Sequence, residues 1–302
     1  MNIFKRIYKR LNTDFYRAQY MKVVPAVLNT PHVAPGNLPF VLLSMVHHRD
    51  VLPYLVAAKS FLKYVPAQRV VVVCDPSITA KDHEIFKEHI PHIELRDANE
   101  FTHVDIPRGG CWERLYAISE YSQTDYVVQL DADTVTTQAV PEVVQAIQAK
   151  TGFVLGEVEN QAVESLAVTS ARAKPWLKNT QHIQAVVEAA MSVLPLPVGA
   201  LYVRGCAGFC GFPAGQVMRD TLLSFSKTMF NHFGERWATW GTEQITSNYI
   251  VANLVGTQVL PFPKYGTPDV SNQMSAFIHF IGPMRFTSSK YIRLTKEQLA
   301  NN

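Results

Sequence analysis

Short apolar runs alternate with segments of helical periodicity through the first half of this 302-residue chain. Such runs suit strands that are buried on both faces, which is the environment of a parallel sheet. The apolar segments are 40–46, 69–75, 92–97 and 126–130, and the helical segments between them are 52–65, 79–90 (with Thr79 as N-cap) and 110–122. This order predicts an α/β fold in which a mostly parallel central sheet carries helices on both faces.

The second half of the chain is more mixed. Its predicted strands are 153–158, 201–212 and 276–281, and its predicted helices are 181–193, 215–232 and 241–254. The chain contains no internal repeat and no low-complexity segment. We therefore expect one domain over residues 39–286, preceded by a segment and linker (1–38) and followed by a tail (287–302).

Charge is concentrated at the N-terminus. Residues 1–22 hold six basic residues and one acid, a net charge of +5, whereas the remainder holds 22 basic and 24 acidic residues, a net charge of −2. A slightly acidic body argues against nucleic acid as a partner. In residues 1–22 apolar side chains recur at helical spacing between the basic ones: Ile3, Phe4, Ile7, Tyr8, Leu11 and Phe15.

This pattern has two readings. It is typical of a helix that lies on anionic lipid, and equally of a helix that packs on its own domain or on a partner protein. The proline-rich stretch that follows, up to residue 38, predicts a linker or an extended arm. No apolar run approaches the roughly 18 residues of a membrane span. The four cysteines form no C-x-x-C pair, which indicates reduced residues of a cytoplasmic protein. On the lipid reading of residues 1–22, this protein would contact the inner face of the membrane peripherally.

Two aspartates interrupt the chain directly after the apolar run 126–130. Asp131 and Asp133 lie where a parallel strand ends, and Asp75 ends the run 69–75 in the same way. In open α/β sheets, ligands bind beyond the carboxyl ends of the strands. Two carboxylates so close together would repel each other unless a cation lay between them. The alternative is a turn in which Asp133 caps the next helix.

Three later stretches place polar residues in unusual positions. His279 interrupts an apolar strand and is followed by Gly282 and Arg285; a buried histidine without a ligand is the alternative. Glu243 and Gln244 open a helix, where an acid also favours the helix dipole. Residues 204–212 form a strand of small side chains, which suggests close approach of a ligand or of another backbone. The glycine-rich phosphate-binding motifs of P-loop and dinucleotide-binding proteins are absent from the sequence.

Together these motifs resemble glycosyltransferase family 8 and its relatives of the GT-A (Rossmann-like) fold. The family has an apolar strand ending in D-x-D, a strand with F-N-A-G, a D-Q-D-x-L-N segment and a final H-x-x-G-x-x-K. The corresponding stretches here are QLDAD (129–133), GCAGFCGF (205–212), TEQITSNYI (242–250) and HFIGPMR (279–285). Arg114 stands where the family has an arginine one helix before D-x-D. The resemblance covers about residues 39–286.

The resemblance implies a metal-dependent, retaining transfer of a hexose from a nucleotide-diphosphate sugar, with UDP-hexose as the expected donor, to a glycan or lipid-linked acceptor. Asp131, Asp133 and His279 would hold Mn²⁺, with Mg²⁺ as the alternative; an imidazole ligand favours Mn²⁺. Gln244 and Glu243 would be the catalytic residues, the first beside the anomeric carbon and the second on the sugar hydroxyls. The expected donor-binding residues are Asp75, Arg114, Asp131, Cys206, Ala207, Gly208, Gly282, Arg285 and His48.

The sequence departs from the family at three places. The family binds and stacks on uracil with an aspartate and a tyrosine after the first strand, whereas this chain reads HHRDVLPYL (47–55), where His48 could stack instead. Cys206 replaces a polar residue, and Glu243 replaces an aspartate. Two alternatives stay open: a nucleotidyltransferase that forms nucleotide-sugars, and a non-catalytic relative that binds a nucleotide or glycan.

Overall fold

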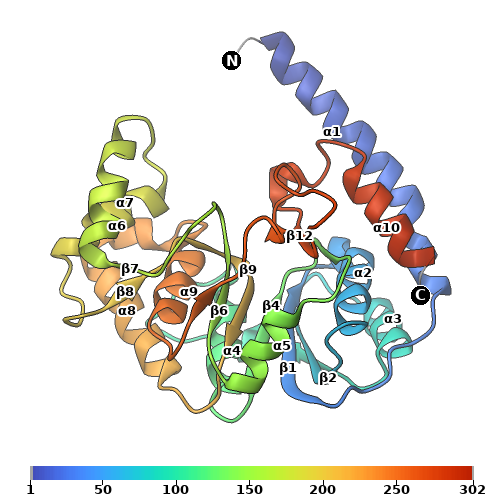
Figure 1. Ribbon diagram of the computed structural model, residues 1–302, viewed down its shortest axis with the longest axis horizontal. Helices are drawn as coiled ribbons and strands as arrows, with labels where there is room; N and C mark the ends of the chain where they lie inside the picture. The colour runs from blue at the N-terminus through green and yellow to red at the C-terminus, as the bar shows by residue number, and fades with distance from the viewer. Residues whose placement is uncertain (1–2, 301–302) are drawn as a thin grey trace.

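The structure, a computed structural model, describes residues 3–300 and is built on a seven-stranded sheet (Figure 1). Its strand order is β10-β6-β9-β4-β1-β2-β3, and only β9 runs antiparallel to its neighbours. The strands are β1 (Leu38–Val46), β2 (Ala67–Cys74), β3 (Ile93–Asp97), β4 (Tyr126–Leu130), β6 (Phe153–Gly156), β9 (Gly205–Phe212) and β10 (Gln258–Val259). The predicted mostly parallel sheet is confirmed.

Helices cover both faces of this sheet, as predicted. The helices are α1 (Ile3–Val23), α2 (Val51–Leu62), α3 (Ala80–His89), α4 (Trp112–Tyr121), α5 (Pro141–Ala149), α6 (Leu166–Ala173), α7 (Ile183–Ala190), α8 (Met218–Phe233), α9 (Thr242–Ala252) and α10 (Lys290–Ala300). Side chains of β1 alternate between two cores: Leu42 packs with α2, whereas Val41 and Leu43 pack with α4, α8 and α9. An all-apolar run is therefore buried on both faces because each face has its own layer of helices.

Thr79 caps α3 as its sequence predicts. Its hydroxyl accepts a hydrogen bond from the backbone N–H of Asp82, and the Asp82 carboxylate accepts one from the Thr79 N–H at 2.8 Å. This reciprocal pair satisfies two backbone donors that a helix start otherwise leaves open. The Asp82 carboxylate is therefore engaged in capping α3, the helix that follows β2.

A second sheet lies beside the end of β4. It has the order β11-β12-β5, with β5 (Thr134–Thr136), β11 (Tyr265–Gly266) and β12 (Phe277–His279). β12 pairs antiparallel with β5, so that His279 is opposite Thr134. The alternative reading, in which Asp133 caps a helix, is wrong, because the chain continues directly into β5. The strand predicted over 201–212 is divided into β8 (Leu201–Tyr202), which pairs with β7 (Glu164–Ser165), and β9.

The two terminal helices, α1 and α10, pack against each other, and α10 also contacts α2. Residues 24–29 form a 3₁₀ helix with Val24 and Val27 fully buried, so a linker over this stretch is wrong; residues 31–36 run without regular structure, as an arm. Tyr20 of α1 stacks on Tyr291 of α10 with ring centroids 4.2 Å apart. These side chains belong to the same core as β1 and α2. Nothing is described for the side chains of Ile3 and Phe4, and none of the described helices is long and apolar enough to cross a bilayer.

Candidate active site

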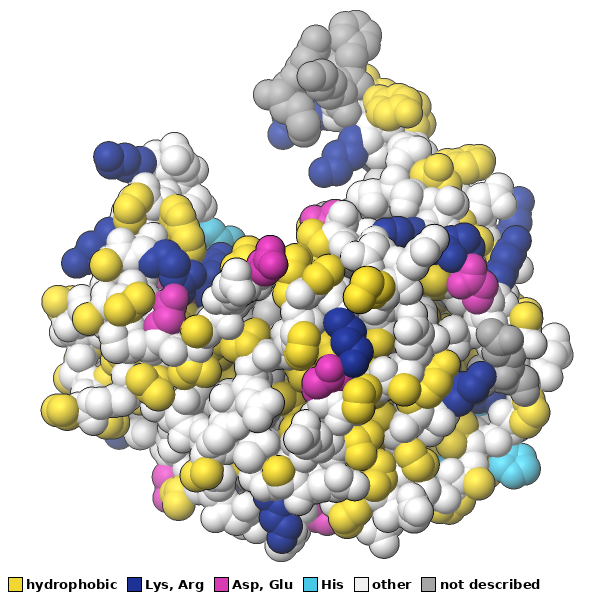
Figure 2. All heavy atoms as spheres, viewed as in Figure 1, with side chains coloured by type: hydrophobic (Ala, Val, Ile, Leu, Met, Phe, Trp, Pro, Cys, Tyr) yellow, Lys and Arg dark blue, Asp and Glu magenta, His cyan; other side chains and the backbone are white. Residues whose placement is uncertain are grey.

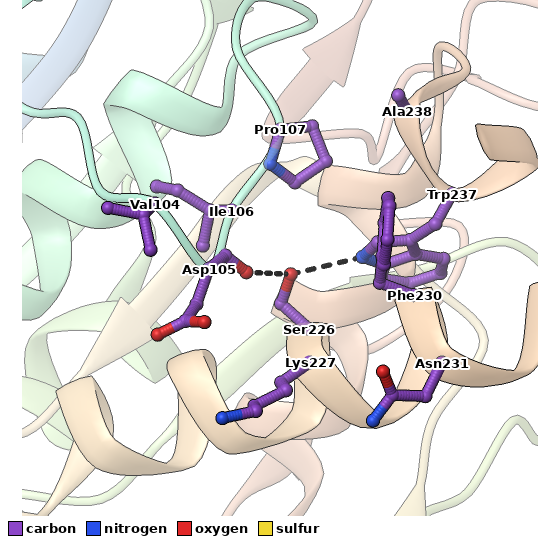
Figure 3. A pocket seen from close by; sticks show the side chains of 10 residues that line it. All are labelled: Val104, Asp105, Ile106, Pro107, Ser226, Lys227, Phe230, Asn231, Trp237 and Ala238. Atoms are coloured by element: carbon purple, nitrogen blue, oxygen red, sulfur yellow. Dashed lines mark hydrogen bonds between the residues drawn. The ribbon is translucent and has the colours of Figure 1, made fainter. Parts of the chain in front are cut away.

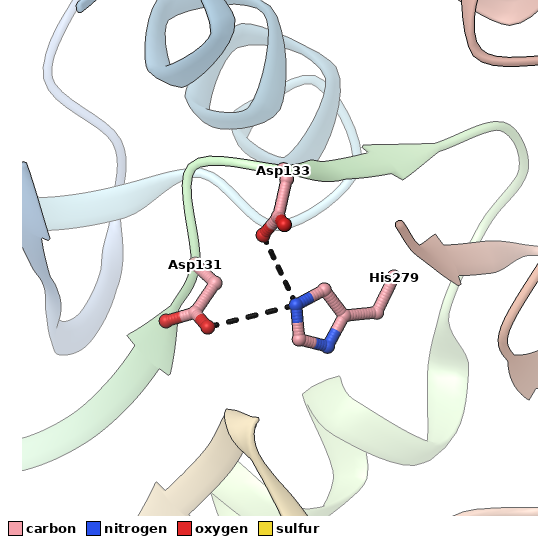
Figure 4. A group of neighbouring side chains, drawn as sticks. All are labelled: Asp131, Asp133 and His279. Carbon is pink, nitrogen blue, oxygen red and sulfur yellow. Dashed lines mark hydrogen bonds and ion pairs between the residues drawn. The ribbon is translucent and has the colours of Figure 1, made fainter. Parts of the chain in front are cut away.

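The two aspartates and the histidine meet at the carboxyl end of β4 (Figure 4). The chain leaves β4 at Asp131, passes Asp133 and enters β5, and β12 brings His279 against both carboxylates. His279 Nε2 lies 3.0 Å from Asp133 Oδ1 and 3.5 Å from Asp131 Oδ2. One ligand atom from each of the three residues lies within 4.8 Å of the others. Two carboxylates and an imidazole in this arrangement form a donor set that can hold a divalent cation.

Arginines pair with the carboxylates of this cluster. Arg285 donates to Asp133 Oδ2 from Nη2 at 2.6 Å and to Asp50 Oδ1 from Nη1 at 2.7 Å. Arg114, which is buried, pairs with Asp131 and reaches Glu243 Oε1 at 3.0 Å. Each acid of the cluster therefore has a cationic partner, which the buried carboxylates of Asp133 and Glu243 in particular require.

Burial and charge act in opposite directions on the titrating groups. Burial alone would raise the pKa of Asp133, but His279 and Arg285 outweigh burial and hold that pKa well below its usual value. Burial would lower the pKa of His279, yet Cys206 and Asp133 raise it well above its usual value. For Glu243 burial dominates, with Arg114 opposing it and Asp131 adding to it, and its pKa is raised to about 7.

Strand β9 lies directly under the cluster and has to be small there. A Cβ atom on Gly208 would lie 2.1 Å from His279 Cε1 and 2.8 Å from Asp131 Oδ2, so any side chain would displace both. Cys206 is buried with its Sγ 3.2 Å from His279 Nδ1. The small residues of β9, which were predicted to allow close approach of a ligand or another backbone, thus leave room for the side chains of His279 and Asp131.

A cavity of about 100 Å³ adjoins the cluster. Among the predicted residues it is lined by Arg114, Ala207, Gly208, Glu243 and Gln244, and it is completed by Gly110, Cys111, His182, Gln184, Trp240 and Gly241. Glu243 and Gln244 lie in the first turn of α9, which begins after Gly241 at a φ of 99°. The left-handed backbone at this glycine turns the chain so that both side chains meet the cavity.

A chain of hydrogen bonds sets the orientation of the Gln244 amide. Glu188 is fully buried and ion-paired with Arg204, so its carboxylate only accepts hydrogen bonds. Gln184 must then direct its Nε2 to Glu188 (3.1 Å) and its Oε1 to Gln244 Nε2 (3.5 Å). One N–H of the Gln244 amide is therefore directed to Gln184, another residue that lines the cavity, and the Gln244 Oε1 accepts no hydrogen bond from this chain of residues.

Three other predicted residues lie apart from this cavity. The Asp75 carboxylate accepts from the backbone and hydroxyl of Ser77, at 2.9 and 2.6 Å. His48 Nδ1 lies 2.7 Å from Asp82 Oδ2. Gly282 begins the turn that leads from β12 to Arg285. None of the three lines the cavity beside Gln244.

Sequence reasoning missed several residues of the site. Asp50 lies at the end of the short segment after β1 and pairs with Arg285. Nothing in the sequence around Asp50 indicates that Arg285 is its partner. Gln184 and His182 open α7, and Trp240 precedes α9 with its side chain largely exposed at the cavity. These positions follow from tertiary packing and carry no local motif.

A larger cavity of about 290 Å³ lies between the 104–107 loop and α8 (Figure 3). Three of its polar groups form a chain: Trp237 Nε1 donates to Ser226 Oγ, which donates to the Asp105 carbonyl oxygen at 2.7 Å. None of the predicted site residues lines it. The smaller cavity beside the carboxylates is the better candidate for a reaction site.

Solved structures share this fold. A galactosyltransferase, LgtC, in complex with donor and acceptor sugar analogs matches 87% of this chain and 96% of its own at 13% identity, with a TM-score of 0.53. An active-site mutant of LgtC, in which glutamate replaces glutamine, gives 13% identity, coverage of 87% and 95%, and a TM-score of 0.51. Mouse xyloside xylosyltransferase 1 gives 11% identity, coverage of 80% and 96%, and a TM-score of 0.46. No protein-family model matches the chain, and no curated protein matches it in sequence.

The matches to LgtC define the class of fold. The mostly parallel sheet with a single antiparallel strand and the second small sheet form the GT-A glycosyltransferase fold. The fold predicted from the sequence is confirmed. At this level of identity the likeness concerns the fold, and the activity has to be argued from the site.

Proposed function

We propose that the protein is a metal-dependent glycosyltransferase that moves a hexose from a nucleotide-diphosphate sugar to a glycan or lipid-linked acceptor. One observation carries this proposal: residues from three distant parts of the sequence, Asp131, Asp133 and His279, form a metal-ligand cluster beside the cavity that holds Gln244. A cluster that served only stability would not need an adjoining cavity into which Arg114, Glu243 and Gln244 face.

The metal-ligating atoms of this cluster support Mn²⁺ as the resident cation, with Mg²⁺ as the alternative. Asp131, Asp133 and His279 would hold it, and the imidazole favours Mn²⁺ over Mg²⁺. When bound, the cation neutralises charge on the diphosphate of the donor. Arg114 borders the same cavity and would contact the donor phosphate or sugar. Arg285 is held by Asp133 and Asp50 through three of its five N–H donors, so the other two would be available to a phosphate.

Gln244 is the residue that we propose to act at the anomeric carbon. The Oε1 of its amide carries partial negative charge, which suits an oxocarbenium-like transition state. Glu243 would bind sugar hydroxyls from the same turn of α9. LgtC also has a glutamine in its active site, the one replaced by glutamate in the mutant, which supports a glutamine among the site residues proposed here. We expect retention of the anomeric configuration.

The donor and acceptor are proposed by class. LgtC was crystallised with donor and acceptor sugar analogs, which supports a nucleotide sugar and a glycan as partners. UDP-hexose is the donor that we propose; the His48 region, which would contact the base, departs from the family pattern. Cytoplasmic location stays a prediction.

The first experiment is a thermal-shift panel of UDP, GDP, CDP and ADP, each with and without Mn²⁺. We expect one nucleotide to stabilise the protein only when Mn²⁺ is present; at 100-fold over its Kd a ligand adds about 2.7 kcal/mol. Slow hydrolysis of the matching nucleotide sugar separates an enzyme from a non-catalytic binder. The corresponding nucleoside triphosphates are tested in the same way, and stabilisation by one of them in place of any diphosphate would favour the nucleotidyltransferase. No response to any combination would refute the proposal.

A further inference from the structure

The N-terminal helix turns an apolar face away from the body of the protein. One side of α1 is held by Tyr20, which stacks on Tyr291, and by Asn12, whose Nδ2 donates to the Thr287 carbonyl oxygen at 3.0 Å. Five apolar side chains remain between 49% and 73% exposed: Ile7, Tyr8, Leu11, Phe15 and Met21. Ile7, Leu11 and Phe15 are spaced four residues apart and therefore share one face.

Figure 2 shows hydrophobic side chains along the outer edge of this helix, with Lys and Arg side chains close to them. Between residues 6 and 22 five exposed basic residues accompany a single acid, Asp14: Arg6, Lys9, Arg10, Arg17 and Lys22. Asp14 lies 3.9 Å from Arg10 and 3.6 Å from Arg17. Because it is a single acid among five basic residues on an exposed surface, it offsets little of the positive charge. An apolar face bordered by excess positive charge matches the boundary between acyl chains and anionic headgroups.

We propose that this outward face of α1 docks on an anionic lipid surface. A second copy of the chain is a poorer occupant, because two such faces would bring like charges together without acids to pair them. The helix would lie in the plane of the interface, since no described helix is long and apolar enough to cross a bilayer. The two readings of residues 1–22 are therefore compatible, because the inner side packs on the domain and the outer side is left for lipid.

The helix is also connected to the candidate active site. Phe286 lies under α1, with the Arg17 guanidinium 5.5 Å and the Tyr20 ring 5.6 Å from its ring centroid. The preceding residue is Arg285, which pairs with Asp133. A membrane that holds α1 would thus hold this end of the molecule at its surface. If the proposed function is correct, the acceptors that follow from this geometry are glycans carried on membrane lipids.

The test is sedimentation of the full-length protein with vesicles of phosphatidylcholine alone and with roughly one-third phosphatidylglycerol. We expect binding to the anionic vesicles only, weakened about tenfold when NaCl is raised from about 0.1 M to about 0.5 M. The double variant Leu11→Ser/Phe15→Ser should lose about tenfold or more of this binding, because both side chains would insert into the interface. Its melting temperature should match the wild type, because both positions are exposed.

The matched control is Val193→Ser/Val198→Ser, which removes two exposed apolar side chains away from α1 and should bind vesicles as the wild type does. Unchanged binding of the Leu11→Ser/Phe15→Ser variant, or equal binding of the wild type to neutral vesicles, would overturn the proposal. The wild type could instead form a dimer and bind no vesicles. If the Leu11→Ser/Phe15→Ser variant is then monomeric and the control variant is not, the face belongs to a contact with a second copy of the chain. Vesicle binding needs no nucleotide, so failure of the proposed function would leave this result intact.

Discussion

Asp133 is the residue on which the metal proposal can be tested most directly. Replacing Asp133 by Ala removes one predicted ligand and leaves Arg285 with Asp50 as its remaining partner. We expect the stabilisation by nucleotide plus Mn²⁺ to disappear, while the free energy of unfolding falls by about 3 kcal/mol and the fold is kept. Thermal shift with and without Mn²⁺, together with a denaturant titration, measures both effects.

Asp125→Ala is a suitable control for this prediction. Asp125 pairs with Arg69 at 3.0 Å, and this ion pair is partly exposed. Its loss should cost at most about 1 kcal/mol and leave the nucleotide response unchanged. A full Mn²⁺ response in Asp133→Ala would show that the cation binds elsewhere.

Gln184 is a positioning residue in this account, because it acts through Gln244. Gln184→Met removes the acceptor for the Gln244 amide and frees that amide to rotate. We expect kcat for donor hydrolysis to fall about tenfold, with KM for the donor and the nucleotide-induced thermal shift unchanged. Tyr202→Phe removes a different hydrogen bond to Glu188, of 3.0 Å, and should leave kcat as it was. Equal losses of kcat in both variants would mean that the network serves stability alone.

The residues of the candidate metal cluster stand out in the sequence because each one breaks a local rule. Asp131 and Asp133 follow a buried strand, and His279 interrupts another, so the sequence itself marks them as exceptions. Asp50 and Gln184 obey their local rules, one in a short turn and the other in the first turn of a helix. Their importance arises from partners far away in the sequence, which a single chain without its fold does not reveal.

At the scale of elements, periodic segments were predicted well and non-periodic ones were not. β1, β2, α2 and α3 lie within a few residues of their predicted ranges, because burial on two faces or one leaves a clear pattern. Residues 24–29 were expected in a linker because proline and polar residues surround them. Tertiary packing overrides that local preference: Val24 and Val27 fill the core beside α2.

The packing of α1 leads to a prediction about this element. Tyr20 is fully buried and stacks on Tyr291, whereas Tyr8 on the same helix is mostly exposed. Tyr20→Ala should therefore lower the free energy of unfolding by about 3 kcal/mol, and Tyr8→Ala should change it by less than about 0.5 kcal/mol. Denaturant unfolding of both variants provides the measurement. Equal effects would mean that α1 is not docked on α10 as the structure has it.

At the scale of the whole molecule, the fold and the charges of the site have different roles. Two apolar cores, one on each side of the seven-stranded sheet, hold the elements in place. The candidate metal site lies at the edge of this scaffold, where the strands end. Substitution of side chains there has little effect on the packing of the two cores. Stability and metal binding should consequently be separable in this protein.

Chelation tests this separation. In the structure each carboxylate of the cluster already has a protein cation as partner: Arg285 for Asp133, and Arg114 for Asp131 and Glu243. Removal of a divalent cation with EDTA therefore leaves no buried charge without compensation, in contrast to structural zinc domains, which unfold without metal. We expect one cooperative unfolding transition in EDTA, with Tm within about 3 °C of the value in Mn²⁺ and no nucleotide. Circular dichroism melts in both conditions measure this difference. Unfolding by EDTA at 25 °C would mean that the cation stabilises the fold in addition to binding the donor.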